Sequence, residues 1–299
     1  MQFIAPIAVT DAMLTASSLE EDDYPAWSAA TVYAVGDRAI LTSTHRIYQR
    51  LNAGSGPAAP NLDATNWVDV GPTNKWAPFD RGVGSAATSG SDTTLSYTIT
   101  PGQVVTGLVL MDAACDAVSI RVTAGGDVIY EKEYAPVIAA DLAIGDWYSY
   151  FFESIKRRVS LLDAALPAFS EAVIDVVLTG AAPLRIGTMA LGRPYTIGSA
   201  LAGGRLSIID YSVKTTDEFG TTTLVERAYA RRLEANVVVS TMAISTISQR
   251  LADIRATPVV WIGDSSVDST LIYGWCREWA IEMQYQNISY CNMVVEGLV

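Results

Sequence analysis

Histidine is almost absent from this sequence, which has 299 residues and a single histidine, His45. An imidazole-activated nucleophile, a multi-histidine metal site or a histidine general base would each depend on that one residue. His45 lies in residues 42–48, which read as the tip of a short hairpin, so we expect an exposed polar side chain there. The sequence also lacks the G-x-x-x-x-G-K-[ST], G-x-G-x-x-G and G-x-S-x-G motifs. These absences predict that the protein is not an enzyme and has no cofactor.

Cysteine and positive charge are also scarce. The three cysteines, Cys115, Cys276 and Cys291, are too few and too scattered for a disulfide framework or a zinc cluster, so we expect buried thiols and no metal site. The 20 basic residues are outnumbered by 32 acidic ones, which gives a formal net charge of −12. A chain with this charge repels a phosphate backbone, so no nucleic-acid partner is expected.

Long hydrophobic runs are missing as well. The longest apolar stretches, 104–111 and 172–184, are interrupted well before the ~18 residues that a membrane helix needs, so no membrane span is expected. Residues 1–6 lack the basic region of a secretory signal, which favours folding in a cytoplasm. Yet 50% of the residues are hydrophobic and only 17% are charged. That composition leaves more apolar surface than one core needs and favours assembly with other chains.

Composition and patterning predict a mainly β chain in five segments. They are an N-terminal arm and acidic linker at 1–23, a small β-domain at 24–70, a linker at 71–91, a β-sandwich at 92–200 and an α+β portion at 201–299. The strands of the small domain are expected at 31–33, 38–41, 46–49 and 66–68. The acidic run 20–23 lacks the alternating spacing of a calcium loop and is expected to be a solvated segment.

Alternation of apolar and polar residues predicts the strands of the sandwich. It is clearest around Tyr97, Ile120 and Val176, whose neighbours two positions away are also apolar. Residues 104–111 form a largely apolar run, which is typical of a strand covered on both faces. The glycine pair 125–126 predicts a tight turn between two strands. An antiparallel β-sandwich is the fold that joins these features.

The period of the apolar residues changes from that of a strand to that of a helix after residue 239. Ile244, Ile247 and Leu251 recur at helical spacing and predict one helix over about 240–255. Strands are expected around it at 205–214, 221–229, 232–239, 259–262, 270–284 and 289–297. The C-terminal portion is therefore expected to be α+β, with one helix packed on an antiparallel sheet.

Three of the seven tryptophans, Trp261, Trp275 and Trp279, lie close together in this portion. One helical stripe cannot cover all of that apolar surface, and tryptophan is frequent in protein interfaces. These residues are candidates for an assembly interface. The alternative, that all three lie in the core of their own domain, is equally compatible with the sequence.

Residues 27–67 resemble the small chitin-binding, carbohydrate-binding modules of bacterial chitinases. The family's succession of Trp, Tyr, Gly-Asp, a short strand, Tyr, Pro and Trp occurs here in the same order and at matching spacing. The resemblance implies a small three-stranded domain that binds carbohydrate. The candidate carbohydrate-binding residues are Trp27, Tyr33, Tyr48 and Trp67.

One stretch departs from that family pattern. Modules that bind crystalline polysaccharide usually present an exposed aromatic ring just before the proline, because a flat ring stacks on a sugar at little entropic cost. Here the corresponding residues, 54–60, contain no aromatic residue. The four aromatic candidates therefore have a second interpretation as the core of a domain too small to bury much else.

Residues 73–80, Thr-Asn-Lys-Trp-Ala-Pro-Phe-Asp, are similar to a junction in tail-tip and baseplate proteins of bacteriophages with long, non-contractile tails. In that family a small carbohydrate-type module precedes a β-sandwich, and segments 186–192, 258–263, 273–275 and 290–298 fit the same group. The resemblance implies a minor tail protein located in the virion tail tip, made in the host bacterial cytoplasm, without cofactors. The partners it implies are other tail and baseplate proteins, further copies of the chain in a symmetric assembly, and host cell-surface polysaccharide.

Two other classes of protein stay open at this point. A secreted or virion-associated glycan-degrading enzyme would need two carboxylates roughly 5 to 9 Å apart in a cleft. The available residues are Asp141, Asp146, Asp175, Asp210, Asp217 and Glu218. A free-standing lectin or adhesin would need only the module and a sandwich. If the protein is a phage tail component, it could be either a connector or the receptor-binding tip itself, and the sequence is compatible with both.

Overall fold

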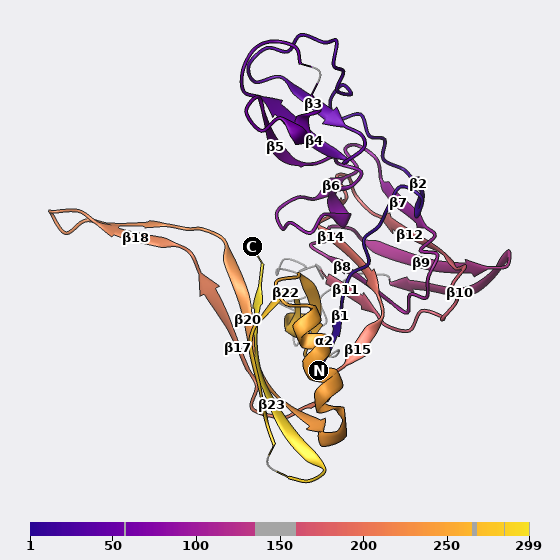
Figure 1. The fold of residues 1–299 in the computed structure, drawn as a ribbon, viewed down its shortest axis with the longest axis vertical. Coiled ribbons are helices and arrows are strands. Elements are labelled where there is room, and N and C mark those ends of the chain that lie inside the picture. The colour runs from indigo at the N-terminus through magenta and orange to yellow at the C-terminus, as the bar shows by residue number, and fades with distance from the viewer. Residues whose placement is uncertain (57, 135–159, 265–267, 284, 299) are drawn as a thin grey trace, which may run out of the picture.

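The computed structural model describes residues 1–56, 58–134, 160–264, 268–283 and 285–298. In this part of the chain the fold is mainly β, with several antiparallel sheets and one α-helix near the C-terminus. Figure 1 shows a small module at the top, a sandwich at the right and a long C-terminal sheet with its helix below. The predicted fold class is confirmed.

The small module contains a three-stranded antiparallel sheet, as the resemblance of residues 27–67 implies. Its order is β3–β4–β5, with bounds Arg38–Leu41, Arg46–Arg50 and Trp67–Pro72, and the 3₁₀-helix η1 (Pro60–Leu62) precedes β5. The expected strand at 31–33 does not form. Tyr33 exchanges one pair of backbone hydrogen bonds with Gly54, and Thr31 bonds back to Ser28 in a turn, so no ladder develops.

The sandwich packs a five-stranded sheet against a three-stranded sheet around one large core. The five-stranded sheet has the order β10 (Asp127–Tyr134), β9 (Ala117–Ala124), β12 (Val173–Thr179), β7 (Thr94–Ile99) and β2 (Leu14–Ser17). The three-stranded sheet has the order β11 (Ser160–Asp163), β8 (Gly107–Met111) and β14 (Thr188–Gly192). A separate pair is formed by β6 (Ala87–Thr88) and β13 (Arg185–Ile186), and η2 spans Ala77–Phe79. The glycine pair 125–126 makes the expected turn between β9 and β10, with φ of 61° and 92°.

Strand β8 is covered on both faces, as its continuous apolar run predicts. Leu108 and Leu110 point into the sandwich core. Val109, between them, packs on the opposite side against Val260 and Tyr273 of the C-terminal sheet. This cluster around Val109 joins the sandwich to the C-terminal sheet through apolar side chains.

The C-terminal sheet assembles strands from both ends of the chain. Its order is β15 (Pro194–Thr196), β1 (Gln2–Ile4), β21 (Val259–Ile262), β22 (Leu271–Glu282), β23 (Ile288–Gly297), β20 (Tyr229–Ser240) and β16 (Ser199–Ala200), with η4 (Asp268–Thr270) leading into β22. Strand β17 (Arg205–Asp210) also pairs with β20. One face of the sheet carries the core cluster on which the helix packs.

Helix α2 (Ile244–Asp253) is the helix that the spacing predicts, and a 3₁₀ turn, η3 (Thr241–Ala243), replaces its expected first turn. Ile247 and Leu251 are buried against the sheet. The chain leaves the helix through Ala256, which has a φ of 55°.

The N-terminal residues, expected as one strand or arm followed by an acidic linker, contribute a strand to each of two sheets. Residues 2–4 form β1 between β15 and β21, and residues 14–17 form β2 on the edge of the sandwich. Residues 194–200, expected at the end of the sandwich, pair within the C-terminal sheet. The partners of these short strands lie far away in sequence, so no local pattern identifies the pairing.

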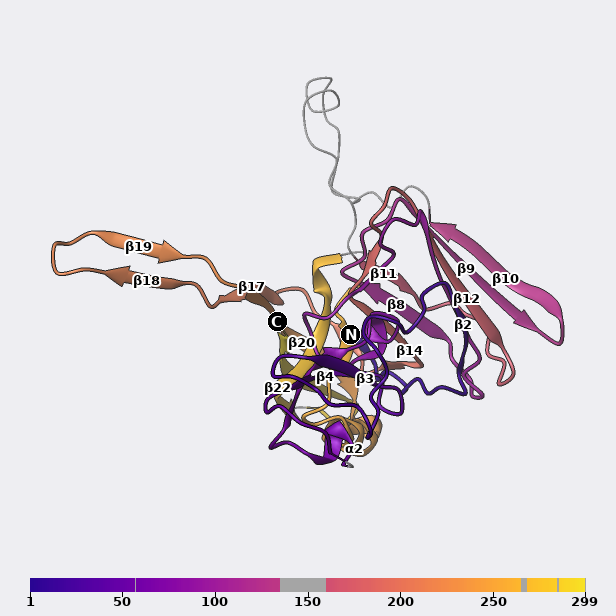
Figure 2. The same cartoon turned by 90° about the horizontal axis from the view of Figure 1, so that it is seen from above.

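Residues 211–228 form a hairpin that projects from the body of the molecule. Its strands β18 (Val213–Thr216) and β19 (Thr222–Val225) pair only with each other. Figures 1 and 2 both show this hairpin extending far from the sandwich and the sheet. We call residues 211–228 the projecting hairpin.

Candidate assembly and binding surfaces

Three of the four candidate carbohydrate-binding residues lie in the core of the module. Tyr33, Tyr48 and Trp67 are 7%, 6% and 3% exposed. The Tyr33 ring meets the Trp67 ring edge-on, with centroids 4.9 Å apart, and the guanidinium of Arg50 lies 5.0 Å from the Trp67 ring centroid. Trp27 is half-buried against this cluster. Little ring surface is left to stack on a sugar, which favours the interpretation of these residues as a miniature core.

The side chain of His45 is clamped where the module meets the sandwich. The expectation of an exposed side chain was wrong: His45 is 18% exposed, and its two ring nitrogens lie 3.1 Å from carboxylate oxygens of Asp11 and Glu21. Its ring stacks on Trp76. The hairpin tip does lie at 42–45, but it docks onto residues 73–80 because the Thr73 amide donates to the His45 carbonyl at 2.9 Å.

The acidic run 20–23 takes part in the same junction. Glu21, expected in a solvated segment, is 16% exposed and accepts a hydrogen bond from the Thr73 hydroxyl at 3.1 Å. The Asp23 carboxylate accepts a hydrogen bond from the backbone amide of Asn74 at 2.9 Å. Glu21 and Asp23 therefore connect the segment before the module to the segment after it.

The three clustered tryptophans have different environments. Trp261 is fully buried, packs against Phe3 and donates its indole N–H to the Gly274 carbonyl at 3.3 Å. Trp279 is half-buried on the helix side of the sheet. Trp275 lies opposite Glu296 in the register and is 38% exposed. Trp275 is therefore the most exposed of the three.

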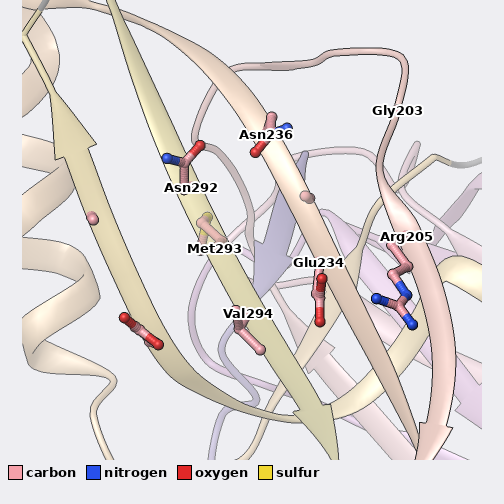
Figure 3. A pocket seen from close by; sticks show the side chains of 10 residues that line it. Gly203, Arg205, Glu234, Asn236, Asn292, Met293 and Val294 are labelled. Atoms are coloured by element: carbon pink, nitrogen blue, oxygen red, sulfur yellow. The ribbon is translucent and has the colours of Figure 1, made fainter.

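The other face of the C-terminal sheet carries a shallow polar hollow, shown in Figure 3. Its volume is about 350 Å³. The register places Arg205, Glu234, Val294 and Glu278 in one row across four strands, and Asn236 and Asn292 face each other in the next. These side chains offer hydrogen-bond donors and acceptors on an open surface, without the apolar enclosure that a small-molecule site needs.

The candidate carboxylates among the described residues lie in three separate parts of the fold. Asp175 lies on β12 and accepts a hydrogen bond from the Thr98 hydroxyl at 2.6 Å. Asp210, at the end of β17, has a lowered pKa because the Ser212 hydroxyl and amide donate to it. Asp217 and Glu218 are at the tip of the projecting hairpin. Asp141 and Asp146 lie outside the described residues.

The projecting hairpin carries exposed apolar side chains, a feature that the sequence interpretation missed. Its exposed fractions are 50% for Tyr211, 37% for Val213, 93% for Phe219, 72% for Leu224 and 47% for Val225. All eight residues of its two strands are exposed. The sequence did contain a signal for this exposure. Phe219 follows two acidic residues and precedes a glycine, a composition typical of a turn, where an aromatic ring has no neighbouring strand to pack on. The hairpin therefore presents apolar side chains that the described part of the chain leaves uncovered.

An apolar cavity lies at the base of the projecting hairpin, between the sandwich and the C-terminal sheet. Its volume is about 520 Å³. Side chains from the loop before β6, from β8, β20 and β22 and from the C-terminal residues line it. They include Val83, Met111, Arg231, Leu271, Tyr273 and Leu298.

Within the described ranges, no three His, Cys, Asp or Glu side chains are grouped so that they could hold a metal ion. None of the helices described there is long and apolar enough to cross a membrane. The chain matches no protein-family model, and it matches no curated protein either.

Proposed function

We propose that this protein is a structural component of the tail tip or baseplate of a long-tailed, non-contractile bacteriophage, where it contributes to tail assembly. The observation that carries the proposal is the projecting hairpin, which presents Phe219 and Leu224 with exposed fractions of 93% and 72%. An exposed apolar element on a rigid frame is typical of a subunit that docks with neighbours. In this proposal the chain is located in the virion, and its partners are other tail proteins and further copies of itself.

The junction at 73–80 supports the same proposal. Trp76 and Ala77 are buried in the core of the sandwich. The Asn74 side chain exchanges two hydrogen bonds with the Thr88 backbone, at 2.9 and 2.8 Å. The residues that resemble the phage tail-tip pattern therefore fasten the module to the sandwich. Such a fastening suits a particle component that must keep its parts in fixed positions.

A second role, attachment to host-surface glycans, is proposed for the module. The resemblance of residues 27–67 supports it, and Trp27 is the candidate whose ring keeps partial exposure. With Tyr33, Tyr48 and Trp67 in the core, binding by one copy should be weak. Several copies in a symmetric tail would raise the avidity by roughly 10²–10⁴-fold.

Mass spectrometry of purified tailed particles tests the proposal. The protein should be present at a fixed copy number per particle and should stay attached after washing in high salt. A control protein from the same host lysate should disappear in those washes. Absence of the chain from the particles would contradict the proposal, and release of reducing sugar from host polysaccharide by the purified chain would favour the enzyme alternative.

A further inference from the structure

We propose that the tip of the projecting hairpin inserts Phe219 into the apolar cavity of a second copy of this chain, so that copies join head to tail. This inference rests on the proposed function and specifies one contact of the assembly. It follows from the tip, the cavity and the charges beside each of them.

The tip is a preformed turn that holds its aromatic ring outward. One carboxylate oxygen of Asp217 accepts hydrogen bonds from the Phe219 amide at 3.0 Å and from the Thr221 amide at 2.7 Å. The Asp217 amide donates to the Thr221 carbonyl at 3.0 Å, and the Gly220 amide donates to the Asp217 carbonyl at 3.0 Å. The ring is 93% exposed. A fixed backbone presents the ring at little further entropic cost on binding.

The cavity suits an aromatic side chain. Its volume of about 520 Å³ lies within the ~300–1,000 Å³ range of pockets that enclose sizeable groups. Leu271 and Tyr273 form buried walls, while Met111 and Leu298 are partly exposed around them. An aromatic ring buries roughly 150–250 Å² of surface, which is the kind of contact that dominates interface energies.

The geometry favours a second copy over the same molecule. The cavity lies at the base of the projecting hairpin, where Arg231 belongs to both β20 and the cavity wall. Residues 211–219 extend roughly 30 Å from that base at about 3.3 Å per residue, and both views show them pointing away from the body. A tip cannot turn back to its own base without breaking the strands. One chain therefore carries two surfaces that fit each other only between copies.

The charges also match. Glu218, exposed beside Phe219, would approach the guanidinium of Arg231 when the ring enters the cavity. The carboxylate of Asp112, which also lines the cavity, is already paired with Arg185 at 2.6 Å. Opposite charges at the rim of an interface fix its register and raise the association rate. A tip-to-base contact uses two different surfaces, so it continues from copy to copy and closes into a ring when the rotation permits. A ring of copies is compatible with a symmetric tail.

Photo-crosslinking of the full-length chain tests the contact directly. A benzophenone amino acid replaces Phe219, and unlabelled protein is mixed with ¹⁵N-labelled protein before irradiation. The expected products join residue 219 of one copy to Met111 or Leu298 of the other, in peptides of mixed isotope content. The same probe at Met242, which is 92% exposed and lies on η3, serves as the matched control and should give no defined partner. Crosslinks from 219 that scatter over the surface or stay within one copy would overturn the proposal.

Sedimentation velocity of substituted chains tests the energetic part. Phe219→Ala should weaken self-association at least about tenfold, whereas Met242→Ala should not change it. Glu218→Arg and Arg231→Glu should each weaken association, and the double substitution should restore it. Equal association of all variants, or no rescue by the double substitution, would contradict the contact. Circular dichroism of each variant checks that the fold is kept.

The two proposals can fail separately. A chain that is found in particles but crosslinks from 219 to a different tail protein keeps the proposed function and refutes the second-copy contact. A chain that forms the predicted crosslink in solution but is absent from particles keeps the contact and refutes the proposed function.

Discussion

The ring of His45 stacks on the indole of Trp76, with centroids 3.9 Å apart and planes inclined by 18°. Trp76 contacts Phe79, and Phe79 contacts Tyr97 of the sandwich, with centroids 5.9 and 5.5 Å apart. This row of rings leads from the hairpin tip of the module into the sandwich core. The segment 71–91, expected as a linker, thus supplies two of the rings that hold the module in place.

Replacing His45 with Asn should loosen the module from the sandwich while both stay folded. Asn tolerates the φ of 55° at this position but removes the stacked ring, whose contact is worth about 0.5–1.5 kcal/mol. Hydrogen exchange should become faster at 42–45 and 73–80. Equal protection in wild type and His45→Asn would show that the stack does not fasten the module.

Truncation of Trp67 to Ala should unfold the module. The side chain is 3% exposed, and loss of a buried aromatic costs about 3–5 kcal/mol, which is comparable to the whole stability of so small a unit. Proteolysis should then cut within 24–70 and leave the sandwich intact. Trp27→Ala, at a half-buried position, should be milder. If Trp67→Ala stays folded and loses only sugar affinity, the ring is a binding platform and not part of the core.

Glycan binding by the isolated module should be near millimolar, because three of its four candidate aromatic residues are in the core. An array of host polysaccharides probed with the monomeric chain and with whole particles measures both affinities. Particles should bind roughly 10²–10⁴-fold more strongly through multivalency. Trp27→Ala should abolish what binding remains. No binding by either form would make the module a structural spacer.

Replacing Trp275 with Ser should leave the fold intact and impair incorporation into tails. The residue is 38% exposed, so its removal should cost less free energy of unfolding than removal of the fully buried Trp261. Trp261→Ala at the buried position should instead cost about 3–5 kcal/mol and unfold the C-terminal sheet. Thermal unfolding and particle incorporation are measured for both. A large loss of stability in Trp275→Ser would mean that its contacts belong to the fold and not to assembly.

The native cysteines should resist alkylation at pH 8. Burial disfavours the thiolate and raises the pKa of Cys276 to about 12 and that of Cys291 to about 11. Since both values lie well above pH 8, nearly all of each thiol is protonated and slow to react with iodoacetamide. Labelling should rise only as the pH approaches 11, or after unfolding in urea, where free thiols have a pKa near 8.5. Mass spectrometry measures the extent, and rapid labelling of native Cys276 at pH 8 would contradict the expected protection.

The elements that the sequence predicted correctly are those with a strong local pattern. Helix α2 follows from the spacing of Ile247 and Leu251, and β8 follows from a run of apolar residues that two layers must cover. The alternation around Ile120 and Val176 marks strands with one buried face. In each case the buried residues recur once per helical turn or at every second strand position, so the pattern can be recognised within a short stretch of sequence.

The sequence by itself determined the mainly β fold class, strands 38–41 and 46–49 of the module and helix α2, because hydrophobic periodicity and turn residues are local. Only the tertiary structure decided where β1 and β2 pair, that His45 is clamped against Trp76, and which of three adjacent tryptophans faces outward. It also decided that the strands near Phe219 leave the sheet instead of extending it. These outcomes depend on contacts between residues far apart in the chain. The energies of such contacts cannot be inferred from the pattern of neighbouring residues.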